Sequence, residues 1–133
     1  MEELKILSQK KVEIIDITFE IKKEIEKRKI KDGIVIIFIP HTTCGLILTE
    51  NEPNLKKDFL DFFQEITKDF DFAHNKIDDN AQAHLLSAIL GQEKTLIIKE
   101  NKLVLGTWQS ICLVELDGPR ERKIYLKFLS ENW

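Results

Sequence analysis

Ile34-Val35-Ile36-Ile37-Phe38-Ile39, followed by Pro40 and His41, is the stretch that decides the fold. A continuous run of β-branched and aromatic residues is typical of a strand buried on both faces. Pro40 ends this strand because a proline has no N–H to donate to the sheet. The stretch therefore predicts a central strand that carries His41 at its C-terminal end.

The sequence before this run predicts two short strands and a helix. Leu4–Leu7 and Lys11–Ile17 have the composition of strands that pair through the three residues between them. Thr18 suits a helix N-cap, and isoleucines four residues apart follow it on one helix face. We expect the helix to end before Gly33, which stands where a C-capping glycine would stand.

The sequence after the run predicts a strand, two helices and then more strands. Gly45–Thr49 reads as a strand, and Asn51 with Pro53 supplies a helix start. Asp78 or Asp79 caps a second helix. Four strands or strand pieces follow, at Thr95–Lys99, Leu103–Gly106, Trp108–Leu116 and Arg122–Leu129. This order predicts an α+β fold of sheet layers with flanking helices.

The composition excludes several classes of protein. The 133 residues contain no repeat or linker, so we expect one domain over residues 1–133. The net charge is −3 and no basic cluster stands out, which disfavours a nucleic-acid partner. No segment has the pattern of a signal peptide or the length of a membrane span. Two cysteines make no disulfide framework, so we expect a cytoplasmic protein.

The chain has only three histidines, and they are the candidate metal ligands. His41, His74 and His84 each lie near the end of a predicted element or in a loop, where functional groups are usually placed. Three neutral imidazoles that meet would bind Zn²⁺ or a similar ion and leave one coordination position open. Their spacings of thirty-three and ten residues match neither a zinc-finger nor an HExxH pattern, so three unrelated histidines are the competing interpretation.

Other polar residues have a functional and a structural interpretation. Arg120 follows a turn sequence and is either a clamp for phosphate or carboxylate or a surface ion pair. Cys44 stands three residues after His41, but a small core residue suits it better than a ligand, and the same holds for Cys112. Trp108 suits a core or subunit-interface aromatic better than a stacking platform for substrate.

Four blocks of sequence resemble the YjbQ family, also called the secondary thiamine-phosphate synthase family, over nearly the whole chain. They are Pro40–Gly45 with Glu50-Asn51, His74 with Asp78–His84, Gly106–Gln109, and Glu115–Arg120. The resemblance implies a compact β-sandwich with flanking helices that assembles as a homotrimer. It also implies that His41, His74 and His84 bind a divalent metal, with Zn²⁺ expected first, and that Arg120 lies near a bound anion.

On this basis we expect a metal-dependent enzyme that acts on a small phosphorylated metabolite, with weak thiamine-phosphate synthase activity. That activity joins two phosphorylated precursors and expels diphosphate. The residues expected in catalysis are Glu50, Asp78 and Arg120; those expected to bind phosphate or a sulfate-like anion are Thr42, Thr43, Asn80 and Arg120. Two alternatives stay open: a non-catalytic module that binds metal or a phosphorylated ligand, and a structural trimer braced by metal.

Overall fold

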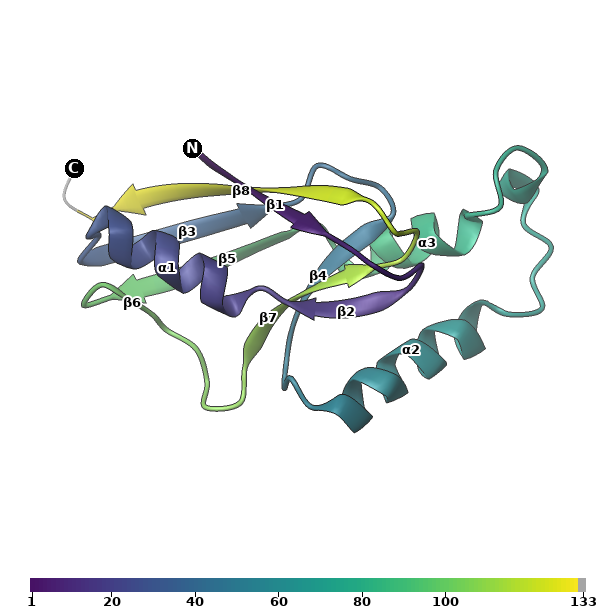
Figure 1. Cartoon of the computed structure of the whole chain (residues 1–133), viewed down its shortest axis with the longest axis horizontal. Helices are drawn as coiled ribbons and strands as arrows, with labels where there is room; N and C mark the ends of the chain where they lie inside the picture. Colours follow the sequence, from purple (N-terminus) through teal and green to yellow (C-terminus); the bar gives the residue numbers. More distant parts are fainter. Residues whose placement is uncertain (132–133) are drawn as a thin grey trace.

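Two antiparallel sheets form the body of the protein, which a computed structural model describes over residues 1–131 (Figure 1). The larger sheet has the strand order β1-β8-β3-β5-β6 and the smaller has the order β2-β7-β4. The strands are β1 (Glu2–Leu7), β2 (Glu13–Asp16), β3 (Asp32–Phe38), β4 (Cys44–Thr49), β5 (Glu93–Lys99), β6 (Lys102–Leu103), β7 (Ser110–Glu115) and β8 (Glu121–Ser130). The helices are α1 (Thr18–Arg28), α2 (Pro53–Thr67), the 3-10 helix η1 (Ala73–Lys76) and α3 (Ala81–Leu90). The predicted α+β fold of sheet layers with flanking helices is confirmed; residues 132–133 of the predicted domain lie outside the described residues.

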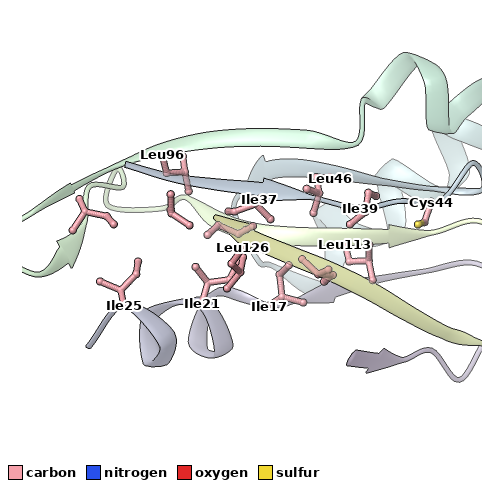
Figure 2. Close-up of a cluster of buried hydrophobic side chains, with 14 residues drawn as sticks. Ile17, Ile21, Ile25, Ile37, Ile39, Cys44, Leu46, Leu96, Leu113 and Leu126 are labelled. Atoms are coloured by element: carbon pink, nitrogen blue, oxygen red, sulfur yellow. The ribbon is translucent and has the colours of Figure 1, made fainter. Parts of the chain in front are cut away.

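The main hydrophobic core lies between the larger sheet on one side and the smaller sheet with α1 on the other (Figure 2). Ile21 and Ile25 of α1 are four residues apart, so one helix face brings both into this core. They meet Val35 and Ile37 of β3 and Leu113 of β7, and all five side chains are at most 1% exposed. The spacing of these apolar residues fixes α1 against the sheets.

A second core covers the other face of the smaller sheet. Phe63 of α2 and Leu86 of α3 pack there with Cys112 and Val114 of β7. Because β7 is covered on both faces, Ile111 to Glu115 are all buried. None of the helices within residues 1–131 is both long and apolar enough to cross a membrane.

The prediction that β3 is buried on both faces is wrong. Its burial alternates: Val35 and Ile37 point into the core, whereas Ile34, Ile36 and Phe38 point to the outer face of the larger sheet. Phe38 is 43% exposed, because no helix within residues 1–131 covers that face. The strand buried on both faces is β7 instead.

The prediction that Gly33 caps a helix is also wrong. The chain leaves α1 through Lys29, which adopts a left-handed conformation with φ 55°. Gly33 lies inside β3, where it is buried. A Cβ atom at this position would collide with the main-chain carbonyl oxygen of Leu129 on β8. Glycine is therefore needed for the close approach of β3 and β8 and not for a helix end.

The helix starts differ from the prediction by one or two residues. Thr18 is the first residue of α1 rather than its cap; its hydroxyl donates to Asp16 and accepts from the N–H of Ile111. Glu52 caps α2 by accepting from two main-chain N–H groups, and Asn80 directly precedes α3. Shifts of one or two residues at a helix end are within the usual uncertainty of helix boundaries.

We expect Gly33→Ala to destabilise the fold by about 1–3 kcal/mol, because the rigid Leu129 carbonyl cannot move away from the added methyl group. Urea unfolding measures the effect. Gly106→Ala is the matched control, since its methyl group would meet the flexible side chain of Gln109, with Oε1 3.1 Å away. Equal stability of the two variants would contradict this account of β3 and β8.

Candidate functional site

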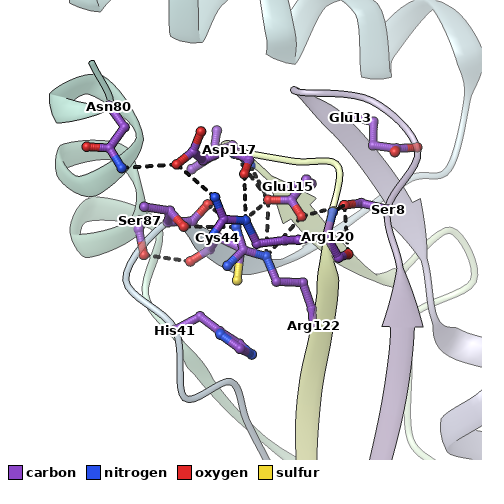
Figure 3. Close-up of polar contacts among 12 residues, drawn as sticks. Ser8, Glu13, His41, Cys44, Asn80, Ser87, Glu115, Asp117, Arg120 and Arg122 are labelled. Atoms are coloured by element: carbon purple, nitrogen blue, oxygen red, sulfur yellow. Dashed lines mark hydrogen bonds and ion pairs between the residues drawn. The ribbon is translucent and has the colours of Figure 1, made fainter. Parts of the chain in front are cut away.

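The ends of four strands meet in one polar region (Figure 3). His41 follows β3, Thr43 precedes β4, and Glu115 ends β7. The turn after β7 carries Asp117 and Arg120 and leads directly into β8. These are loops and element ends, which commonly carry binding and catalytic groups.

A buried ion pair between Glu115 and Arg122 lies at the centre of this region. Their side chains are 0% and 2% exposed, and Arg122 Nη2 donates to Glu115 Oε2 while its Nε lies 2.9 Å from Oε1. Ser8 donates its hydroxyl hydrogen to Glu115 over 2.7 Å. Arg122 Nη2 also lies 3.0 Å from the Thr43 carbonyl oxygen and 2.9 Å from its hydroxyl. The pair therefore joins β7, β8, the start of β4 and the β1–β2 connection.

Two opposing effects act on the pKa of Glu115. Burial raises it, but the hydrogen bonds from Arg122 and Ser8 lower it more, and the pKa lies below the ordinary value. Glu115 is thus a carboxylate that balances the buried charge of Arg122.

Asp117 connects Glu115 of the buried ion pair to Asn80, which directly precedes α3. The N–H of Asp117 donates to Glu115 Oε2 over 3.1 Å, which fixes the residue beside the pair. Its Oδ2 accepts from Asn80 Nδ2 at 3.0 Å and from Arg120 Nη2 at 3.2 Å, and its carbonyl accepts from Arg120 Nε at 2.8 Å. Arg120 is thereby held in one orientation while its side chain remains 51% exposed.

His74 and His84 form a pair on the helical side. Their ring centroids are 4.9 Å apart, with the rings nearly perpendicular. His74 Nε2 lies 2.8 Å from Asn80 Oδ1. Because Asn80 uses its amide hydrogen for the Asp117 carboxylate, its oxygen faces His74 and Nε2 of His74 carries the hydrogen. The lone pair of His74 Nδ1 is therefore free to bind a ligand.

α3 is anchored so that His84 keeps its place. The buried hydroxyl of Ser87 donates to the Cys44 carbonyl oxygen at 2.6 Å. The N–H of Ala81 at the start of the helix donates to the Asn75 side chain at 3.0 Å. Both bonds hold α3 against β4 and η1.

His41 lies with the two arginines rather than with the histidine pair. Figure 3 shows His41 and Asn80 at opposite ends of the drawn group, with the two arginine side chains in its centre. Its Nε2 accepts a hydrogen bond from the N–H of Lys123 over 2.9 Å, so Nδ1 carries the hydrogen of the neutral ring. Burial lowers the pKa of His41, and the charge of Arg122 lowers it further. His41 is thus a neutral hydrogen-bond donor at physiological pH.

The structure brings together most, but not all, of the residues expected from sequence. Within residues 1–131, no three His, Cys, Asp or Glu side chains are placed closely enough to hold a metal ion, so a preformed three-histidine cluster is absent. Asp78 is exposed beside the pair; its N–H donates to the His74 carbonyl oxygen. Thr42 is exposed, whereas the buried Thr43 hydroxyl is bound to Arg122.

Glu50 lies away from this group. It follows the far end of β4, since Cys44 at the near end pairs with Glu115 and Thr49 pairs with Ser110 at the opposite end of β7. Within the described residues of one copy, Glu50 is therefore not brought together with His41, Asp117 and Arg120, because the extended strand β4 carries the chain away from them. Its catalytic role stays a prediction.

The prediction that Cys44 and Cys112 are core residues is confirmed, whereas the prediction that Trp108 is a core residue is not. Cys44 and Cys112 are fully buried, and burial raises the pKa of each thiol to about 11. Both are thiols in the core at neutral pH and not metal-binding thiolates. Trp108 is 73% exposed, so it is no core residue of this chain; a role at a subunit interface remains a prediction.

Sequence reasoning missed the buried ion pair. A signal existed: Glu115 is an acidic residue that ends the apolar run Ile111–Val114, and such a residue must find a partner when the run is buried. Its partner Arg122 lies on the core face of β8, the same face as the buried Ile124 and Leu126. Only the pairing of the two sheets reveals that they meet.

Comparisons with known proteins point to one family. The model of the family described as "UPF0047 protein YjbQ-like" matches residues 2–131. A UPF0047 protein of Methanocaldococcus jannaschii is 41% identical over 129 residues, which cover 96% of this chain and 92% of that protein. A crystal structure of a YbjQ-like protein of unknown function from Sulfolobus solfataricus has a TM-score of 0.94 and 42% identity, covering 98% of this chain and 96% of that one. An uncharacterised protein of the same family from Clostridium acetobutylicum has a TM-score of 0.90 and 34% identity, covering 97% and 100%.

We expect Glu115→Gln to destabilise the protein by about 3–5 kcal/mol at pH 7, because it leaves the buried charge of Arg122 unpaired. Since the pKa of Glu115 in the folded protein is lowered, its contribution is present above about pH 4.3 and is lost as the pH falls through the lowered value. Urea unfolding should show that the free energies of unfolding of wild type and variant differ less at pH 3 than at pH 7.

Asp61→Asn is the matched control, because it removes a carboxylate from the exposed Lys57–Asp61 pair. Its effect should be far smaller and should depend on salt. A Glu115→Gln variant as stable as this control would show that the pair does not hold the strand ends together.

Proposed function

The chain belongs to the UPF0047 YjbQ-like family, and we propose that it is an enzyme acting on a small phosphorylated metabolite. One observation carries the proposal: a series of hydrogen bonds runs from His74 through Asn80 and Asp117 to Arg120. This series fixes an imidazole pair and a guanidinium relative to each other before any ligand binds. Preorganised groups of this kind stabilise the charge that develops when a phosphate leaves or is attacked.

Arg120 is the proposed phosphate ligand. A guanidinium has five N–H donors, and Asp117 engages only two of them. The remaining three are free among the described residues to bind phosphate oxygens, and Arg120 is half exposed. Thr42 presents an exposed hydroxyl after His41, on the arginine side of the same region. Arg120, Thr42 and Asn80 are therefore the proposed anion-binding residues.

The histidine pair fits part of a divalent metal site. His74 has its Nδ1 lone pair free, Asn80 orients its ring, and the ring of His84 is adjacent. A bound Zn²⁺ would supply Lewis-acid polarisation of a phosphoryl oxygen. Three protein ligands are usual in a catalytic zinc site, and His41 is the proposed third. To bind the ion through Nε2, His41 would give up the hydrogen bond that it accepts from the N–H of Lys123.

Proton transfer is assigned to Asp78. This exposed carboxylate follows η1 and lies beside the pair in the chain, where it would accept or return a proton during reaction. Thiamine-phosphate formation, with loss of diphosphate, is one reaction of this class and a proposal for a side activity.

A non-catalytic module would use the same groups without turnover. An assay for release of phosphate or diphosphate from phosphorylated metabolites distinguishes the enzyme from the binding module, because a module that only binds releases neither product. Activity that is lost on chelation and regained with Zn²⁺ would support a metal-dependent enzyme, and equal activity in both states would remove the metal from the mechanism.

Assembly as a homotrimer in the cytoplasm is likewise proposed from the family resemblance. The outer face of the larger sheet carries Phe38, Ile97 and Leu129, which are 43%, 59% and 42% exposed. Association of copies would bury such apolar surface. A metal that only braces copies would keep them associated and give no turnover.

We expect Arg120→Gln to weaken binding of inorganic phosphate at least tenfold, because charge-assisted hydrogen bonds are lost. NMR chemical-shift titration measures the affinity. Arg28→Gln is the control, since Arg28 is a surface arginine paired with Glu2. Unchanged phosphate affinity in Arg120→Gln would contradict the proposed anion site.

We expect His84→Ala to weaken binding of Zn²⁺ at least tenfold, measured by competition with a chromophoric chelator, because one imidazole ligand is removed. Lys76→Ala, an exposed residue of η1, is the control. His41→Ala decides the third ligand: a similar loss supports the three-histidine assignment. Wild-type zinc affinity in His84→Ala would refute the pair as a metal site.

A further inference from the structure

A cavity of about 220 Å³ lies between α1 and the hairpin of β5 and β6. This hairpin cavity is lined by Lys22, Ile25, Glu26, Asn101, Lys102 and Leu103. β6 lies at the opposite end of the molecule from α3, which carries His84 (Figure 1). The hairpin cavity is therefore separate from the proposed phosphate and metal site.

The walls of the hairpin cavity are held in place by the fold itself. Ile25 is 1% exposed in the main hydrophobic core, and Leu103 packs against the same core. Leu103 also pairs with Ile98 of β5. The N–H of Asn101 donates to the Lys31 carbonyl oxygen at 2.8 Å, which ties the hairpin turn to the connection after α1. A ligand would thus meet a preorganised apolar floor and a fixed turn.

The side-chain amide of Asn101 makes no hydrogen bond within residues 1–131. Its Oδ1 is buried, and a buried oxygen without a donor costs free energy and calls for an explanation. Because no bond holds the amide, rotation about its last side-chain torsion would turn either Oδ1 or Nδ2 toward the cavity. Asn101 therefore offers an unused acceptor and an unused donor to a ligand.

Charged groups of both signs surround this amide. Lys22, Lys102 and Glu26 line the cavity, and all three are exposed. None of them forms an ion pair in the part of the chain that the structure describes. Lys22 and Glu26 are four residues apart on α1, in the order that is less favourable for a helical ion pair. A carboxylate and an ammonium group of one ligand would each find a partner here.

This combination fits a small zwitterion better than a simple ion. A phosphate would meet the like charge of Glu26, and an amine alone would meet the like charges of Lys22 and Lys102. A molecule that carries both charges avoids either repulsion, and an aliphatic side chain would cover Ile25 and Leu103. The volume exceeds the ~150 Å³ of a cavity known to take up benzene, so a molecule of leucine's size fits.

From these observations we propose that the hairpin cavity binds a free amino acid with an aliphatic side chain. Lys22 and Lys102 bind its carboxylate, and Glu26 with the Asn101 side-chain oxygen binds its ammonium group. This site uses no residue of the proposed phosphate and metal site, so it stands or falls independently of the proposed function.

NMR titration of the full chain with three probes tests the proposal: leucine, 4-methylpentanoate, which lacks the ammonium group, and 3-methylbutylamine, which lacks the carboxylate. Leucine should shift the amide signals of Asn101 and Leu103 and bind at least tenfold more tightly than either analogue. Leucine that shifts neither signal at millimolar concentration would overturn the proposal and leave the charges as a solvated surface. Equal affinity for leucine and either analogue would overturn it as well, because one of the two charges would not be recognised.

Two substitutions distinguish the two charges of the ligand. Lys102→Gln should weaken leucine and 4-methylpentanoate at least fivefold and leave 3-methylbutylamine within twofold. Glu26→Gln should weaken leucine and 3-methylbutylamine at least fivefold and leave 4-methylpentanoate within twofold. Lys23→Gln is the control, because Lys23 is an exposed lysine of α1 outside the cavity. Wild-type affinity for leucine in both cavity variants would place the amino acid elsewhere.

Asn101→Gly tests the amide without straining the turn, because Asn101 has a φ of 61° and glycine adopts this conformation readily. The variant should keep nearly the same urea midpoint, since the amide makes no hydrogen bond that is lost. It should weaken leucine at least fivefold. A lower midpoint with unchanged leucine affinity would show that the amide serves the fold alone and would contradict its role as a ligand-binding group.

Discussion

The buried pair of Glu115 and Arg122 is the interaction on which the site depends. Two charges without access to water are costly unless each is paired and hydrogen-bonded. Here Ser8, Thr43 and the main chain after β7 satisfy the remaining donors and acceptors. These bonds join four segments that are far apart in the chain, so the pair links the end of β7 in the smaller sheet to β8 in the larger sheet.

The buried ion pair positions the residues of the surface site. Asp117 is held by Glu115 through its N–H and in turn orients Arg120 and Asn80. A side chain at Gly118 would collide with the Lys10 carbonyl oxygen and the Ser8 hydroxyl, so the turn lies tightly against the β1–β2 connection. The guanidinium that would meet a ligand is therefore placed by groups that never touch the ligand.

Local sequence predicted the fold class, the amphipathic α1 and the core cysteines, because these follow from periodicity and side-chain size. It failed where long-range pairing decides: β7 rather than β3 is buried on both faces, and Gly33 serves the contact with β8. For the site, the histidines were found by their scarcity. Their division into a pair and a separate His41 could not be predicted, since it depends on how α3 and η1 pack.

The central claim is that the histidine pair and Arg120 serve one ligand. Crystals soaked with Zn²⁺ and inorganic phosphate, with anomalous diffraction at the zinc edge, test it most directly. The account predicts zinc about 2.0–2.1 Å from a ring nitrogen of both His74 and His84, and phosphate oxygens hydrogen-bonded to Arg120. Zinc bound away from both imidazoles, or phosphate bound with Arg120 unengaged, would contradict it.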